Sequence, residues 1–166
     1  AERRTDKGPW RGESPGMPFS ARSATAAFAT TGTVNGGRAP QGALQFSCDF
    51  EGGNLGTSKM LSENEYDLHL RADTNNPKYR LWFYFCIRNA KPHQKVLFHI
   101  VNFSFKSKSL YADGMSPTVR SASRPRWERL HPKNVFYYKS QKKELKNQHV
   151  LSFVHVFTKP DEPVYF

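Results

Sequence analysis

The chain has 166 residues, enough for one domain and a tail, and its 25 basic and 14 acidic residues give it a net charge of +11. That balance favours an acidic partner: a nucleic acid, an anionic membrane or an acidic peptide. The longest apolar run, residues 81–87, is far too short to span a bilayer, and the charged start of the chain is not typical of a signal peptide. We therefore expect a cytosolic or nuclear protein with no membrane partner.

The first part of the chain differs in composition from the rest. Residues 1–43 are rich in Gly, Ala, Ser, Thr and Pro and contain no isoleucine. Such a segment buries too little apolar surface to offset the conformational entropy lost on folding. We expect a flexible low-complexity tail at 1–43 and a folded domain at 44–166.

Two segments in the first half of the domain, 44–50 and 65–71, alternate between apolar and polar residues. This period of two predicts half-buried strands. The residues predicted to share the inward face of the first strand are Leu44, Phe46, Cys48 and Phe50. The Gly-Gly pair that follows, at 52–53, predicts a tight turn with a positive φ angle.

Two later segments, 79–88 and 95–103, are apolar on both faces. That pattern predicts central strands covered on each side. The polar loop between them contains Pro92, and we expect it to join the two strands as a hairpin.

The segment 109–130 has no regular period, and only short strands are expected in it, around Thr118–Arg120 and Trp127–Leu130. A long connection of this kind inside a compact domain is usually functional or disordered. Further strands are predicted at 134–140, 150–157 and 163–166. Six or seven spaced strands without a convincing helix predict an all-β fold, an antiparallel sandwich or barrel.

Residues with catalytic or metal-binding chemistry form no recognisable motif. Cys48 and Cys86 fall in predicted strands and are interpreted as buried free thiols rather than a disulfide or redox pair. None of the six histidines has a glutamate three residues later, as a zinc site of the HxxE type needs, and both phosphate-loop motifs are absent. We therefore expect no catalytic residue, metal or cofactor in this chain. A Ser–His–acid triad stays open, because its members can lie far apart in sequence.

Basic residues gather in two stretches of the chain. Residues 74–112 hold seven Lys or Arg and no acid, and residues 119–143 hold eight more with Glu128 as the one acid. Trp127 and two tyrosines lie among them, a composition typical of a nucleic-acid surface. Arginine pairs with carboxylate as well as with phosphate, so an acidic peptide fits equally. A solvated basic surface without a ligand is the third interpretation.

Five stretches, taken together in chain order, carry a resemblance to a known family. They are 46–56, 66–85, 98–121, 124–130 and 133–138, which include FEGGNLG, YDLHLRADTNNPKYRLWFYF, SKSLYADGM, RPRWERL and KNVFYY. Together they resemble the N-terminal domain of the cytosolic carboxypeptidases, and most of all the small deglutamylase branch of that family.

The resemblance implies an antiparallel β-sandwich placed before a zinc carboxypeptidase domain. Parent enzymes of this kind remove glutamates from polyglutamylated or Glu-ended tails such as those of tubulin, using a zinc-activated water and a glutamate as general base. The family's zinc ligands and catalytic residues lie beyond the matched stretches, so this chain alone is expected to be no enzyme. Its expected partners are its own catalytic domain and acidic tails in the cytoplasm.

The segment 109–130 supplies the predicted interface and substrate-binding residues, because aromatic and Arg side chains are enriched in interface hot spots. The packing candidates are Tyr111, Met115 and Trp127. The acid-binding candidates are Arg120, Arg124, Arg126 and Arg129. The alternative hypothesis is a free-standing basic sandwich that binds nucleic acid, which the family resemblance makes unlikely.

Overall fold

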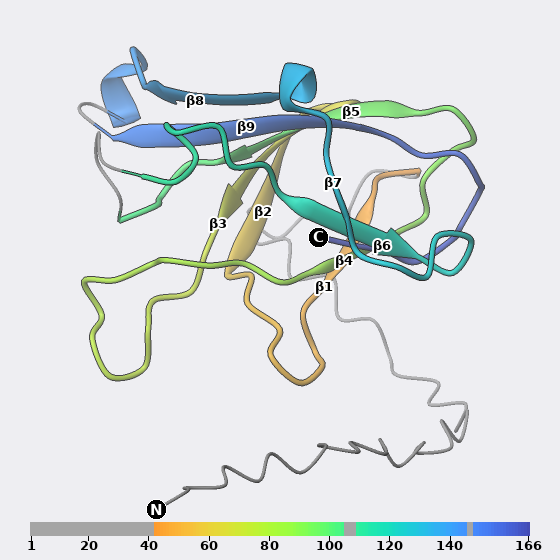
Figure 1. Ribbon diagram of the computed structural model, residues 1–166, viewed down its shortest axis with the longest axis horizontal. Helices are drawn as coiled ribbons and strands as arrows, with labels where there is room; N and C mark the ends of the chain where they lie inside the picture. Colours follow the sequence, from red (N-terminus) through yellow and green to blue (C-terminus); the bar gives the residue numbers. More distant parts are fainter. Residues whose placement is uncertain (1–41, 105–108, 146–147) are drawn as a thin grey trace, which may run out of the picture.

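The computed structural model describes residues 42–104, 109–145 and 148–166 and folds them into two packed five-stranded sheets (Figure 1). The predicted tail at 1–43, except for its last two residues, lies outside the described residues. The strands are β1 (Gln45–Ser47), β2 (Thr57–Ser62), β3 (Glu65–His69), β4 (Cys86–Arg88), β5 (Lys95–Ile100), β6 (Thr118–Ser121), β7 (Glu128–Arg129), β8 (Val135–Lys139), β9 (His149–Val156) and β10 (Val164–Tyr165). Two short 3-10 turns, η1 (Pro132–Asn134) and η2 (Lys143–Leu145), flank β8.

The first sheet has the strand order β1-β4-β10-β6-β7 and the second has the order β2-β3-β5-β9-β8. The strand pairs are antiparallel except for β3 and β5, which run parallel. The predicted all-β sandwich is therefore confirmed. The short strands expected inside 109–130 are present as β6 and β7.

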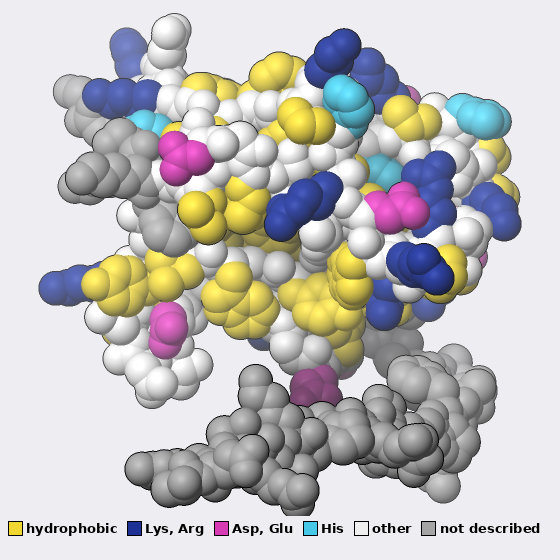
Figure 2. Space-filling view, viewed as in Figure 1, with side chains coloured by type: hydrophobic (Ala, Val, Ile, Leu, Met, Phe, Trp, Pro, Cys, Tyr) yellow, Lys and Arg dark blue, Asp and Glu magenta, His cyan; other side chains and the backbone are white. Residues whose placement is uncertain are grey.

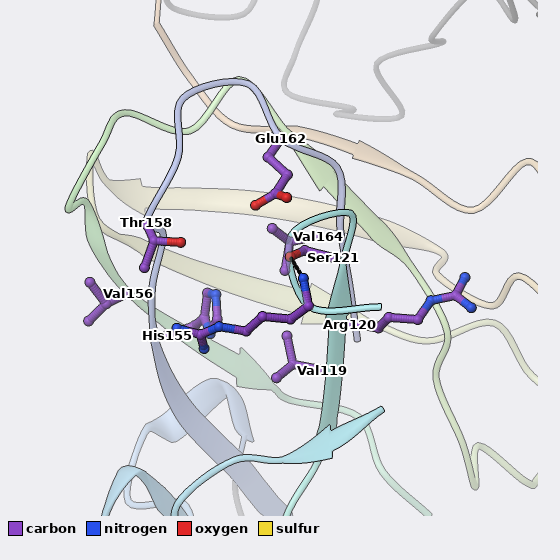
Figure 3. Close-up of a pocket in the computed structure, with 9 residues that line it drawn as sticks. Val119, Arg120, Ser121, His155, Val156, Thr158, Glu162 and Val164 are labelled. Carbon is purple, nitrogen blue, oxygen red and sulfur yellow. Dashed lines mark hydrogen bonds between the residues drawn. The ribbon is translucent and has the colours of Figure 1, made fainter. Parts of the chain in front are cut away.

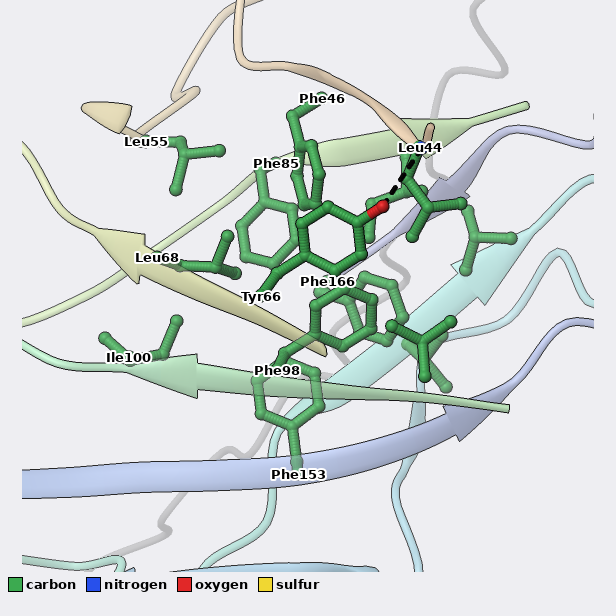
Figure 4. Close-up of a cluster of buried hydrophobic side chains, with 14 of the residues drawn as sticks. Leu44, Phe46, Leu55, Tyr66, Leu68, Phe85, Phe98, Ile100, Phe153 and Phe166 are labelled. Atoms are coloured by element: carbon green, nitrogen blue, oxygen red, sulfur yellow. Dashed lines mark hydrogen bonds between the residues drawn. The ribbon is translucent and has the colours of Figure 1, made fainter. Parts of the chain in front are cut away.

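The core lies between the two sheets and is mostly aromatic (Figure 4). Phe46 from the first sheet lies 6.2 Å from Phe98 of the second, ring centre to ring centre. Phe153 on β9 reaches Phe166 at the end of β10 at 5.5 Å. These rings come from strands whose alternate residues point inward, as the alternation in the sequence predicted.

The segment 79–88 differs from its prediction. Only its last three residues form a strand, β4, and Tyr79, Leu81 and Trp82 are exposed. Local apolarity indicated burial on both faces, yet the sheet offers these residues only one neighbour, an isolated bridge between Tyr84 and Asn54. The prediction of a central strand over the whole segment is wrong.

The predicted hairpin between 79–88 and 95–103 is also wrong. β4 belongs to the first sheet and β5 to the second, so the loop between them carries the chain across the sandwich. β2 was not predicted at all, because its sequence TSKMLS is too polar to show a strand pattern. β2 pairs with β3 and forms one edge of the second sheet.

The turn that follows β1 depends on its two glycines. Gly52 has a φ angle of +73°, as predicted for the pair. A Cβ atom on Gly53 would lie 2.0 Å from the carbonyl oxygen of Cys48, so that position excludes every other residue. The turn ends the strand early and sends Phe50 to the outer face, where its ring lies 4.7 Å from that of Tyr84. The prediction that Phe50 shares a face with Phe46 is therefore wrong.

The two cysteines are both free and buried, as the sequence predicted. Cys48 donates its thiol hydrogen to the carbonyl oxygen of Leu55 at 3.2 Å. Burial raises the pKa of the Cys86 thiol, which keeps it in its unreactive protonated form.

Candidate interaction surface

The segment 109–130 is a pair of turns followed by a short hairpin, and it spreads its candidate residues over more than one place. The carbonyl oxygen of Ser109 accepts hydrogen bonds from the amides of Ala112 and Asp113, which closes the first turn. β6 then pairs with β7, and the amide of Leu130 donates to the carbonyl oxygen of Pro117 at 2.8 Å. This geometry holds the side chains of β6 and β7 on the outer part of the first sheet.

Tyr111 and Met115 lie in the first turn, against the body of the domain. The ring of Tyr111 packs 5.7 Å from Phe103 and 6.3 Å from Tyr137. Burial raises the pKa of Tyr111 to about 12, so the phenol stays neutral. Met115 is half-buried, and its amide donates to the carbonyl oxygen of Leu110 at 2.8 Å.

Arg120 and Trp127 come together on the outer face of the first sheet. The guanidinium carbon of Arg120 lies 5.0 Å from the ring centre of Trp127 and 5.3 Å from that of Tyr165. Such a cation–π arrangement fixes the orientation of an otherwise flexible arginine. Trp127 nevertheless keeps 43% of its surface exposed.

Two further aromatic residues extend this cluster. Tyr84 lies 5.8 Å from Trp127 and 4.7 Å from Phe50, ring centre to ring centre. We call the surface formed by these five residues the arginine–aromatic face; it comprises Phe50, Tyr84, Arg120, Trp127 and Tyr165. Sequence reasoning missed Phe50, Tyr84 and Tyr165 as surface residues. The alternation of Val164, Tyr165 and Phe166, with the first and last buried, was the one signal that pointed to an outward Tyr165.

The other three predicted arginines are not stacked on this face. Arg129 donates from Nη1 to the carbonyl oxygen of Ser116 at 2.9 Å. Arg124 helps to line a small cavity between β6 and β9, together with His155 and Glu162 (Figure 3). Arg126 is exposed. Arg120 is thus the predicted arginine that the structure brings together with Trp127.

A second exposed apolar patch lies where 79–88 leaves the sheet. Leu81 and Trp82 border a hollow of about 330 Å³, which Arg71 and Asp73 also line. Asn54 holds the hollow together, because its side-chain amide donates to the carbonyl oxygen of Trp82 at 2.8 Å and accepts from the backbone amide of Arg71 at 3.1 Å. The hollow is therefore a fixed feature of the domain.

An acid–histidine–serine chain, left open by the sequence, exists on the outer face of the second sheet. Nε2 of His99 lies 3.0 Å from Oε1 of Glu65, and Nδ1 of His99 lies 2.6 Å from Oγ of Ser152. Ser152 is only 2% exposed, and its hydroxyl also donates to the phenol oxygen of Tyr138 at 3.2 Å. A nucleophile must be reached by its substrate, whereas this serine oxygen is enclosed. We interpret the chain as a cross-link between β3, β5, β9 and β8.

Within 42–104, 109–145 and 148–166, no group of three or more His, Cys, Asp or Glu side chains is placed to hold a metal ion. In the same part of the chain, no helix is long and apolar enough to cross a membrane.

Comparison with known proteins gives a consistent family assignment. The family described as "Cytosolic carboxypeptidase N-terminal domain" matches residues 46–158. Cytosolic carboxypeptidase 6 of Homo sapiens is 50% identical over 129 residues, which are 78% of this chain and 25% of that protein. The Mus musculus protein of the same name is 48% identical over 130 residues, 78% of this chain and 24% of the relative.

A solved structure shares the fold. A metallo-carboxypeptidase from Pseudomonas aeruginosa superposes with a TM-score of 0.51 at 20% sequence identity, over 73% of this chain and 28% of that one. The chain thus spans about a quarter of the length of the relatives that it matches.

Proposed function

The chain belongs to the cytosolic carboxypeptidase family as its N-terminal domain, and from this premise we propose that it is a non-catalytic module that supports the catalytic domain of a cytoplasmic zinc carboxypeptidase. The parent enzyme would remove glutamates from polyglutamylated or Glu-ended protein tails, such as those of tubulin. The described residues offer no ligand set that fits zinc. The proposal therefore assigns the metal to the part of the parent outside this chain.

The single observation that carries this proposal is the arginine–aromatic face. Large aromatic side chains rarely stay exposed beside one another unless a partner covers them. Trp and Arg are among the residues most enriched at the energetic centre of interfaces. Here Arg120 is already oriented by Trp127 and Tyr165, so little side-chain entropy remains to be lost on docking. The relatives extend far beyond the matched domain, and we propose their catalytic domain as the partner of this face.

Replacing Trp127 with alanine tests the docking. We expect the affinity between this chain and the remainder of the parent, produced as two polypeptides, to fall by about tenfold or more, because the variant empties the centre of the face. Isothermal titration calorimetry measures the affinity directly. The matched control is Phe136→Ala, which removes an exposed aromatic ring from the other sheet. Equal losses for the two variants, or none for either, would contradict the proposal.

The arginines beside the face suggest a second role, in attracting acidic substrate. Arg124 and Arg126 are exposed and follow directly after β6. We propose that they draw a glutamate-rich tail toward the catalytic domain. Exposed ion pairs contribute only about 0.2–1 kcal/mol each, so their main effect should be on the rate of association.

The double replacement Arg124→Ala with Arg126→Ala in the parent enzyme is expected to lower kcat/KM for a Glu-ended peptide by roughly threefold to tenfold at low salt. The loss should shrink as salt screens the charges. The control pair, Lys59→Ala with Lys95→Ala, removes the same charge from the other sheet. If steady-state kinetics at low salt give the same kcat/KM for both pairs, the two arginines do not guide the substrate.

A further inference from the structure

β8 presents a free strand edge. It forms one end of the second sheet and pairs with β9 alone, and in the described part of the chain no strand lies on its other side. In an antiparallel pair, every second residue directs its N–H and C=O groups away from the partner strand. β8 therefore holds a row of backbone donors and acceptors open to an incoming chain.

The other sheet edges are less suited to pairing. β1 has three residues and β7 has two. β2 carries an irregularity in its register between Met60 and Ser62, of the kind that protects edges from unwanted pairing. β8 keeps an unbroken register with β9 over its five residues. It is the longest regular edge among the described strands.

The side chains of β8 hold the strand in place and leave one face for contact. Val135 and Tyr137 pack against the core, which fixes the backbone. Phe136 and Tyr138 alternate with them on the outer face and are 50% and 44% exposed. The hydroxyl of Tyr138 accepts a hydrogen bond from Ser152, so this ring is also anchored. Two rings at alternate positions can receive apolar side chains of a paired strand.

The charge around β8 selects the kind of partner. Exposed lysines lie at both ends of the strand, Lys133 in η1 before it and Lys139 and Lys143 after it. Glu144 is the one acid among the described residues 131–145. In Figure 2, hydrophobic and basic side chains lie together along the edge of the molecule where β8 runs. A second copy of the strand would bring lysines against lysines, whereas an acidic strand would match them.

We propose that β8 binds an extended segment of a partner protein by strand addition, the segment carrying acidic residues that meet the lysines and apolar residues that meet Phe136 and Tyr138. Backbone hydrogen bonds along the open edge supply affinity, and the side chains supply selectivity. This surface lies on the second sheet, away from the arginine–aromatic face of the first. The inference is therefore independent of the proposed docking to a catalytic domain.

The test uses the full 166-residue chain and a synthetic peptide that alternates glutamate and valine, with binding read by fluorescence anisotropy. Two further peptides carry N-methyl groups on alternate backbone nitrogens, one in each register. A strand added to an edge uses the N–H groups of every second residue only. We therefore expect one methylated peptide to bind like the parent peptide and the other to lose affinity by about tenfold or more. Equal binding by both would overturn the proposal.

Variants of the chain locate the site. The double change Lys133→Glu with Lys139→Glu should weaken peptide binding by about tenfold, and Phe136→Ala by a smaller factor. Lys59→Glu with Lys95→Glu makes the same charge change on exposed residues of β2 and β5 and should have little effect. Trp127→Ala should leave peptide binding unchanged, which separates this outcome from a failure of the docking proposal. Equal losses from the two lysine pairs, or tighter binding of oligothymidylate than of the peptide, would reject strand addition of an acidic segment.

Discussion

Phe153→Ala is expected to lower the free energy of unfolding by roughly 3–5 kcal/mol. Phe153 is fully buried on β9, and its ring lies 5.4 Å from Phe98 and 5.5 Å from Phe166. It also stacks on Phe83 at 6.1 Å with an angle of 9° between the rings. Truncation at this point leaves a cavity bordered by both sheets. The cost is large because the facing rings are held by the surrounding sheets and cannot move in to fill it.

Urea unfolding followed by circular dichroism measures this loss as a shift of the midpoint. Phe136→Ala is the matched control, since Phe136 lies on the neighbouring strand β8 and is half exposed. It should cost about 1 kcal/mol or less. Should Phe153→Ala fail to fold, Phe153→Leu keeps most of the volume and should give an intermediate loss. Equal losses at the two positions would show that the core is not organised around Phe153.

The core around Phe153 could be predicted from sequence because it depends on local alternation. In 44–48 and 150–157, the apolar residues that face the core follow a local pattern, and a single strand carries the information. Leu44, Phe46 and Cys48 are buried as predicted. The same holds for the fold class, since a succession of short strands without helices leaves few architectures.

The segment 79–85 could not be predicted by the same reasoning. An apolar run indicates that a surface will be covered, but not whether the cover is the domain's own second sheet or another protein. Here Tyr79, Leu81 and Trp82 stay exposed. The strand pairing failed for a related reason. Neighbours in sequence need not be neighbours in a sandwich, and β4 and β5 lie in different sheets.

The arginine–aromatic face shows the same division. Arg120 and Trp127 were predicted, because they are close in sequence and have the composition of an interface. Phe50 and Tyr84 come from other parts of the chain and meet Trp127 only through the pairing of β4, β10 and β6. The Glu65–His99–Ser152 chain likewise joins three separate strands. A single sequence contains the residue types of such clusters, while their proximity is a property of the sheet.

His155 carries the second large effect, which is a dependence of stability on pH. Burial, together with the nearby positive charge of Arg124, lowers the pKa of His155 from 6.5 to about 4. The imidazole lies 5.0 Å from the ring of Phe166 and 4.9 Å from that of Phe157. The folded protein therefore keeps this histidine neutral in surroundings that do not solvate a cation.

The consequence follows from proton linkage. Well above pH 6.5 the side chain is neutral in both the folded and the unfolded protein, and its titration contributes no change. As pH falls from 6.5 toward 4, the unfolded chain takes up a proton that the folded chain refuses, so stability is lost. A pKa difference of this size corresponds to about 3 kcal/mol once both states are protonated at still lower pH.

His155→Gln is expected to remove most of this dependence. Urea unfolding at about pH 7 and about pH 4.5 gives two free energies of unfolding, and their difference should be smaller in the variant than in the unchanged chain by about 2 kcal/mol or more. Titration of the carboxylates contributes equally to both chains and cancels. The control is His131→Asn, an exposed position where asparagine can still cap η1. If His155→Gln keeps the full pH dependence, the interior around β9 accepts a charged imidazole. The buried contact between β9 and the end of β10 would then be open to water.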